Sequence, residues 1–185
     1  MYLKEIRSLS KRSMRKMNGK VSNLKVYLVQ DFNVGLLKNM VNFGLNIFGE
    51  LGMDEWGLVP QIRHGNVYVL KEENKKEIVG IAIFMRDWEK VDQCYLFDYA
   101  ISPVFQGKGL GYSFLKILCK ELRCQGFVKI SLTVDIENTA AIKLYKDKMG
   151  FKIESFSKDE YGKGHDRYIM ELDLEDISIN LEKVV

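Results

Sequence analysis

A buried strand that runs into a glycine-rich turn and an amphipathic helix constrains this chain more than any other feature. Residues 94–102 (CYLFDYAIS) are almost continuously apolar, with one acid, Asp98. Such a run is typical of a strand buried on both faces, as the strands of parallel pairs are. After it come QGKGLG (residues 106–111) and a helix to about Gln125 with a single apolar stripe. The pattern predicts a central strand–loop–helix segment.

The rest of the chain supplies strands and helices around this segment. The patterns predict further strands at 24–30, 66–71, 77–86, 128–134, 151–156 and 167–174, and helices at 33–48, 54–63 and 138–149. We expect Asp31 to cap the first of these helices and Pro60 to make the second irregular. Strand–helix–strand–helix at the centre, with antiparallel strands around it, predicts one α+β domain of sandwich-like α/β layers.

Length and composition agree with a single domain. The chain has 185 residues, of which 46% are hydrophobic and 29% charged, enough to bury a core and too apolar for disorder. No apolar run approaches the roughly 18 residues of a membrane-spanning helix, and the basic start lacks the apolar stretch of a secretory signal. Three cysteines, two histidines and no CxxC pair argue against a disulfide scaffold and a zinc site. We expect a reduced, cytoplasmic protein that contacts no membrane and needs no metal.

The net charge of +3 is unevenly distributed. Residues 1–20 hold seven Lys or Arg and one Glu, so the remaining chain is mildly acidic, with a net charge of −3. We expect a flexible extension over 1–20, a domain over 21–175 and a tail over 176–185. A basic extension is able to touch nucleic acid, but this one carries a single aromatic residue and no clean amphipathic face, so we do not expect nucleic acid as a partner.

The glycine-rich turn points to phosphate binding. Backbone N–H groups at the start of a helix have no partner within the helix, and glycines let a phosphate approach them closely. The spacing of Gly107, Gly109 and Gly111 differs from the dinucleotide fingerprint, and no Gly-Lys-Ser/Thr of a Walker loop follows. Taken alone the turn is ambiguous between a structural and a functional role.

A second segment follows the next strand. Asn138 can cap a helix or bond a ligand beside it, and Tyr145 lies two turns further on the same face. Ala140 and Ala141 leave the helix start open to a close neighbour. A capped helix with an aromatic residue in the core explains this segment well when it is taken alone.

Together the two segments resemble the GNAT superfamily of acyl-CoA-dependent N-acyltransferases. The family's phosphate-loop pattern, Gln/Arg-x-x-Gly-x-Gly/Ala, is matched by Gln106, Gly109 and Gly111, and Asn138…Tyr145…Gly150-Phe151 resembles its second cofactor segment. The resemblance covers about residues 24–174. It implies a mixed, mostly antiparallel sheet flanked by helices, whose central parallel strands part near residues 99–101 and 132–134.

The resemblance also implies acetyl-CoA as the cofactor and a set of residues that bind it. The cofactor-binding set is Tyr99, Ala100, Ile101, Gln106, Gly107, Lys108, Gly109, Leu110, Gly111, Tyr112, Asn138, Ala141 and Tyr145. In the family the pantetheine arm satisfies the backbone groups of the parted strands, and an N–H near Tyr99 or Ile101 polarises the thioester carbonyl. By the same resemblance Tyr145 protonates the departing thiolate.

The general base does not follow from the resemblance. Many family members carry a Glu at the position that matches Tyr95, so the usual acid is absent here. Asp98 is the nearest replacement, although on a regular strand it points away from the side of Tyr95. A buried lone acid is either structurally paired or functional, and both readings stay open. Glu160 and Tyr161 belong to a late loop that borders the acceptor pocket in this family, and a base acting through water is a further alternative.

The expected function is therefore an acetyl-CoA-dependent N-acetyltransferase in which a primary amine attacks the thioester directly in a ternary complex. A non-catalytic acyl-CoA-binding domain of the same fold is the alternative. A small molecule or a protein can carry the acceptor amine, and the sequence does not distinguish them. A homodimer is a further expectation.

Overall fold

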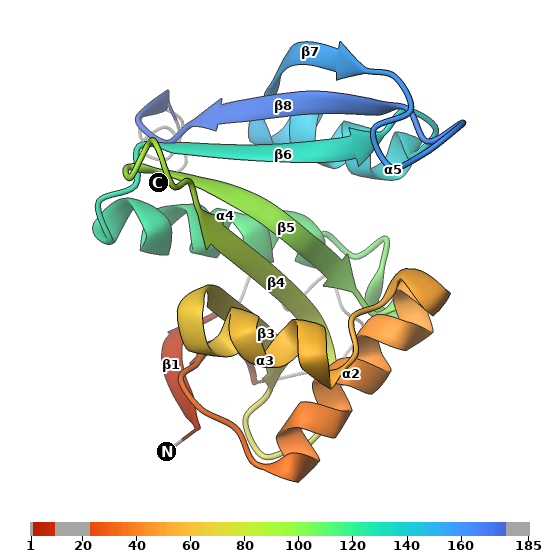
Figure 1. Ribbon diagram of the computed structural model, residues 1–185. Coiled ribbons are helices and arrows are strands. Elements are labelled where there is room, and N and C mark those ends of the chain that lie inside the picture. The colour runs from red at the N-terminus through yellow and green to blue at the C-terminus, as the bar shows by residue number, and fades with distance from the viewer. Residues whose placement is uncertain (1, 10–22, 177–185) are drawn as a thin grey trace. The chain divides into compact units, whose positions relative to one another are not determined.

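The structure, a computed structural model, describes residues 2–9 and 23–176 (Figure 1). The strands are β1 (Leu3–Ser8), β2 (Leu24–Val29), β3 (Asn66–Glu72), β4 (Ile78–Arg86), β5 (Gln93–Ile101), β6 (Lys129–Asp135), β7 (Lys152–Ser157) and β8 (Arg167–Asp173). The helices are α2 (Val34–Phe48), α3 (Glu55–His64), α4 (Leu110–Cys124) and α5 (Thr139–Ile142), the short 3-10 turns η1 (Gly49–Leu51) and η2 (Pro103–Phe105), and the π-helix η3 (Lys143–Met149).

The strands form one mixed sheet in the order β1-β2-β3-β4-β5-β6-β8-β7. Its parallel pair is β5 and β6, and the ladder between them joins residues 93–95 to residues 129–131. Both strands continue past this ladder, β5 to Ile101 and β6 to Asp135. The expected α+β class with a central parallel pair is confirmed. Over the described residues, no helix has both the length and the apolar character needed to cross a bilayer.

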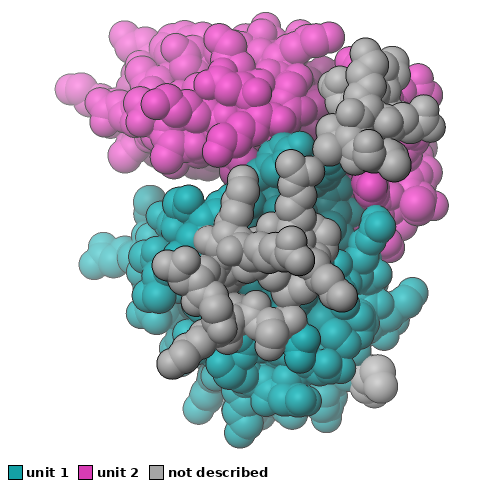
Figure 2. All heavy atoms as spheres, turned by 180° about the vertical axis from the view of Figure 1, so that it is seen from behind, with its two compact units in different colours: residues 1–85, 98–117 teal, residues 86–97, 118–185 magenta. Residues whose placement is uncertain are grey.

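The chain divides into two compact units, which we describe separately (Figure 2). Unit 1 comprises residues 1–85 and 98–117. Its core lies where α2 and α3 cover one face of the strands, and the buried members of this cluster include Met40, Val41, Leu58, Ile62, Val67, Val69, Ile81, Ile83 and Ala100. On the other face the first half of α4 contributes Phe114 and Leu115, both fully buried. This part of the sheet is therefore covered on both sides.

Unit 2 comprises residues 86–97 and 118–185. Along β6 buried and half-buried residues alternate, as expected for a strand with one covered face. The buried face carries Ile130, Leu132 and Val134, while Ser131 and Thr133 lie on the opposite face. Thr133 is therefore available to polar partners.

Three local features differ from the sequence expectation. Leu3–Ser8, inside the expected flexible extension, forms β1 and pairs antiparallel with β2; residues 10–22 lie outside the described part. Asn33, not Asp31, caps α2, because its Oδ1 accepts the Leu36 N–H at 2.9 Å. Asp31 instead accepts the N–H of Phe32 and pairs with Arg63 at 2.9 Å.

The helix expected over 138–149 forms as two pieces. Four residues of α-helix, α5, give way to the π-helix η3, which ends at Gly150 in the left-handed conformation with φ 87°. The N–H groups of Gly150 and Phe151 both point to the Tyr145 carbonyl. Single-turn π segments are uncommon and occur frequently at functional sites.

Candidate active site

The glycine-rich turn of unit 1 has the backbone of a phosphate cradle. Gly107 and Gly109 have φ of 73° and 79°, a conformation that side chains with a Cβ adopt rarely. A Cβ built on either glycine would meet no atom within 4 Å, so there is space in front of the turn. Helix α4 begins at Leu110, and its first-turn N–H groups lack partners within the helix. The turn thus fits a diphosphate, as the resemblance requires.

Side chains of the turn hold its shape. Gln106 Nε2 donates to the Ile101 carbonyl at 2.8 Å and thereby fixes the turn to the end of β5. Lys108 Nζ donates to the Val104 carbonyl at 2.9 Å and lies 5.6 Å from the centre of the Phe105 ring. The lysine thus adds a positive charge at an exposed position of the turn. The groups of the turn that this arrangement leaves available to a ligand are mainly backbone N–H groups.

The residues before the turn divide between two faces of β5. Tyr99 stacks on Phe114 at 5.6 Å between ring centroids, and its hydroxyl donates to the Gly111 carbonyl. Ala100 belongs to the cluster beneath α2 and α3, and Ile101 is buried as well. Tyr99 therefore supports α4 with its side chain, which leaves only its backbone for cofactor binding.

Asp98 is a desolvated acid. Burial raises the pKa of its carboxyl from 3.8 to about 6. Among the described residues it has no hydrogen-bond or ion-pair partner, and alternation along β5 sets it on the same face as Ala100. Asp98 therefore has the raised pKa of a half-buried carboxyl, and its assignment as the general base stays a prediction.

The second predicted segment lies in unit 2. Asn138 Oδ1 accepts the Ala141 N–H at 3.1 Å, so Asn138 caps α5. Tyr145 is buried, at 7% exposure, and its ring packs on Phe151 with centroids 5.5 Å apart. Leu110 and Tyr112, also in the predicted cofactor set, belong to the start of α4 in unit 1.

Unit 2 also contains a cluster of three hydroxyl groups, which we call the hydroxyl cluster. Tyr95 Oη lies 2.9 Å from Thr133 Oγ1 and 3.3 Å from Tyr161 Oη, and the latter two are 3.2 Å apart. Tyr95 is also the last β5 residue of the ladder with β6. Burial, partly offset by the hydrogen bond to Thr133, raises the pKa of Tyr95 to about 12, so its phenol stays neutral.

Tyr161 of the late loop is held from a second side. The Arg167 guanidinium lies 4.9 Å from the centre of its ring and pairs with Asp135 at 3.3 Å. Glu160, its neighbour and the other predicted acceptor residue, is exposed and accepts a hydrogen bond from the Ser157 hydroxyl. Sequence reasoning missed Thr133 and Arg167. The polar residue at an alternating position of β6 was the only signal for Thr133.

Comparison with known proteins identifies the family of this chain and several relatives. The model of the acetyltransferase (GNAT) family matches residues 42–151, more than half of the chain. A ribosomal protein bS18-alanine N-acetyltransferase of Salmonella typhimurium (strain LT2) is 38% identical over 82 residues, which are 43% of this chain and 55% of that protein. The chain therefore spans about half the length of the curated relatives it matches.

Solved structures extend the likeness to most of the fold. The ribosomal-protein-S18-alanine N-acetyltransferase from Escherichia coli has a TM-score of 0.65 at 22% identity and covers 82% of this chain and 94% of its own. A chain of the NatC complex bound to Gag peptide and CoA has a TM-score of 0.69 at 16% identity, over 81% of this chain and 98% of its own. At these identities the structures establish a shared fold.

Proposed function

This chain belongs to the acetyltransferase (GNAT) family, and on that premise we propose that it transfers an acetyl group from acetyl-CoA to a primary amine. The observation that carries the proposal is the turn at 106–111, with two left-handed glycines in front of the start of α4. Its backbone N–H groups and the Lys108 ammonium would hold the diphosphate of the cofactor. When bound, acetyl-CoA supplies the activated acetyl thioester.

Asp98 is the proposed general base. An acceptor amine is mostly protonated at pH 7 and must lose a proton before it attacks. A carboxyl with a pKa of about 6 is largely ionised at pH 7 and still basic enough to take that proton, directly or through a water molecule. Tyr95 occupies the position of the family's usual acid, and its neutral phenol is unsuited to this task.

Tyr145 is the proposed general acid. A phenol keeps its proton at neutral pH and can give it to a departing thiolate. Backbone N–H groups near Tyr99 or Ile101 would donate to the thioester carbonyl, where negative charge develops during attack. Gln106, Asn138 and Ala141 complete the proposed cofactor contacts, in which the chain provides mainly backbone donors.

We further propose that the acceptor amine belongs to a polypeptide. The Salmonella relative is named for an alanine of ribosomal protein bS18. Because the alanine side chain has no nitrogen, N-acetylation of alanine takes place on an α-amine at the start of a chain. Glu160 and Tyr161 are the proposed acceptor contacts of unit 2. A cytoplasmic location and a homodimer stay predictions.

An acetylation assay tests the proposal. The purified protein is incubated with acetyl-CoA and an octapeptide that begins with a free alanine, and release of the CoA thiol is followed. The matched control is the same octapeptide with a blocked α-amine, and a panel of small amines is run beside it. We expect thiol release with the free peptide and none above background with the blocked one. Cofactor binding without release for any amine would instead support a non-catalytic acyl-CoA-binding domain.

A further inference from the structure

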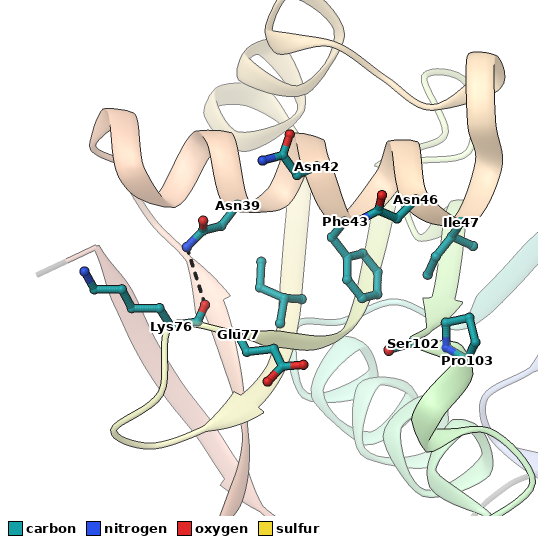
Figure 3. Close-up of a pocket in the computed structure, with 10 residues that line it drawn as sticks. Asn39, Asn42, Phe43, Asn46, Ile47, Lys76, Glu77, Ser102 and Pro103 are labelled. Carbon is teal, nitrogen blue, oxygen red and sulfur yellow. Dashed lines mark hydrogen bonds between the residues drawn. The ribbon is translucent and has the colours of Figure 1, made fainter.

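A cavity of about 290 Å³ lies beside α2 in unit 1 (Figure 3). Three segments line it: one side of α2, the turn into β4 with the start of that strand, and the two residues that follow β5. The lining residues are Asn39, Asn42, Phe43, Asn46, Ile47, Lys76, Glu77, Ile78, Ser102 and Pro103. Ligand pockets begin at roughly 300 Å³. This volume therefore suits one side chain of a larger ligand and is too small for a whole cofactor.

The cavity has an apolar floor and a polar rim. Ile78 is buried, and Phe43 points from α2 into the cavity (Figure 3). Asn42 and Asn46 are exposed on the rim, and Asn39 donates to the Lys76 carbonyl at 3.5 Å. The charged lining residues are Lys76 and Glu77, one of each sign. This lining favours an apolar side chain flanked by neutral amides over an anion.

The spacing of the rim amides matches an extended peptide. Asn42 and Asn46 are four residues apart on α2, a rise of about 6 Å. Alternate residues of an extended chain repeat every 6.6–6.8 Å or so. An asparagine side chain offers both donor and acceptor and can pair with a peptide group on both sides. Asparagine is also a poor helix former compared with Lys or Glu, so its repetition along this side of α2 lacks a folding reason.

The cavity lies within reach of the proposed base. Ser102, the residue directly after β5, follows Asp98 by four residues, about 13 Å along an extended chain. An extended peptide with its α-amine at Asp98 would therefore bring its fourth or fifth residue to the cavity. A small amine bound at Asp98 is too short to reach the cavity.

We propose that this cavity binds the acceptor polypeptide downstream of its acetylated amine. The fourth or fifth residue inserts an apolar side chain onto Phe43, Ile47 and Ile78, while Asn42 and Asn46 pair with the flanking peptide groups. This inference rests on the proposed function. It specifies the acceptor as an extended peptide that the protein contacts over at least four residues.

Two acceptors and two variants test the inference. The acceptors are a dipeptide that begins with alanine and an alanine-first octapeptide with leucine at positions four and five. The variant N42A/N46A removes the rim amides, and K38A, an exposed position of α2 outside the cavity, is the matched control. We expect N42A/N46A to raise the KM for the octapeptide about 10-fold, the effect of two lost hydrogen bonds. KM for the dipeptide and for acetyl-CoA should not change, and K38A should behave as wild type.

Binding of the octapeptide, labelled at its C-terminus and followed by fluorescence anisotropy, separates this inference from the proposed function. If N42A/N46A acetylates and binds the octapeptide as well as the wild type does, the cavity assignment is wrong and the acetyltransferase proposal stands. An equal loss with dipeptide and octapeptide would also overturn the assignment. If no peptide is acetylated but the wild type binds the octapeptide about 10-fold more tightly than N42A/N46A, the peptide site stands and the acetyltransferase proposal falls.

Discussion

The turn at 106–111 in unit 1 and the hydroxyl cluster in unit 2 are built in opposite ways. The turn is six consecutive residues whose proposed binding groups are backbone N–H groups, left accessible by the left-handed Gly107 and Gly109. The hydroxyl cluster joins side chains 28, 38 and 66 residues apart in the chain. A local backbone site depends on the absence of a side chain at one position. A cluster of distant side chains shares its interactions, so the loss of one member leaves a contact between the other two.

The largest expected effect is on the turn. The substitution Gly109→Val puts a β-branched side chain at φ 79°, which costs backbone energy and fills the space in front of the N–H groups. We expect it to abolish CoA binding in a calorimetric titration. Gly44→Ala, in α2 with no atom within 4 Å of the new Cβ, is the matched control and should bind normally. If Gly109→Val still bound CoA, CoA binding would not depend on the backbone of the turn, and the contrast between the turn and the hydroxyl cluster would be wrong.

Asp98→Asn should produce the next largest effect. Removal of a general base lowers turnover by roughly 100-fold or more. In the wild type, kcat/KM should rise with pH to a plateau above about 6, as the carboxyl ionises, and Asp98→Asn should lack this rise. An unchanged pH profile in the variant would assign the base to water or to another residue.

The same substitution has an opposite effect on stability. Burial holds the pKa of Asp98 at about 6, above its ordinary value of 3.8, so the folded protein disfavours the ionised form. The stability that the neutral acid provides is complete below about pH 4 and is lost as the pH rises through 6. Asp98→Asn should therefore increase the free energy of unfolding at about pH 7.5 and leave it nearly unchanged at about pH 4, as measured by urea denaturation at both values.

Tyr145→Phe tests a residue of unit 2 whose role comes from the resemblance. Without its hydroxyl we expect turnover to fall by roughly 10- to 1,000-fold while the affinity for CoA stays similar. Steady-state kinetics and a CoA titration on the same preparation measure both. The ring contact with Phe151 is kept in the variant, so its unfolding curve controls for packing. Normal turnover would remove Tyr145 from the chemistry.

The smallest expected effect is on the hydroxyl cluster. Tyr95→Phe removes one hydroxyl and leaves the contact between Thr133 and Tyr161, so we expect a loss of about 1 kcal/mol in stability and at most a few-fold change in turnover. A double-mutant cycle with Tyr161→Phe measures the coupling between the two phenols. If turnover instead fell by roughly 100-fold, the size expected for a lost acid or base, Tyr95 would be a catalytic residue and the contrast with the turn would disappear.

Several parts of this protein follow from the sequence alone. Strand and helix order, the α+β class and the family pattern all depend on local features: apolar periodicity, and glycines at positions that need positive φ. The turn could be predicted for the same reason, because its motif residues Gln106, Gly109 and Gly111 lie within six residues of one another. The conformation of such a turn is determined by the residues within it.

Only the tertiary structure decided which distant side chains meet. In the sequence, Tyr95 was notable only because it stands at the position where many family members carry Glu. The fold brings its hydroxyl to those of Thr133 and Tyr161. Burial of Asp98 without a partner among the described residues, the break of the last helix into η3 and the cavity beside α2 likewise depend on how segments pack. The physical reason is that desolvation and cross-chain hydrogen bonds depend on distances in space, which local sequence patterns do not specify.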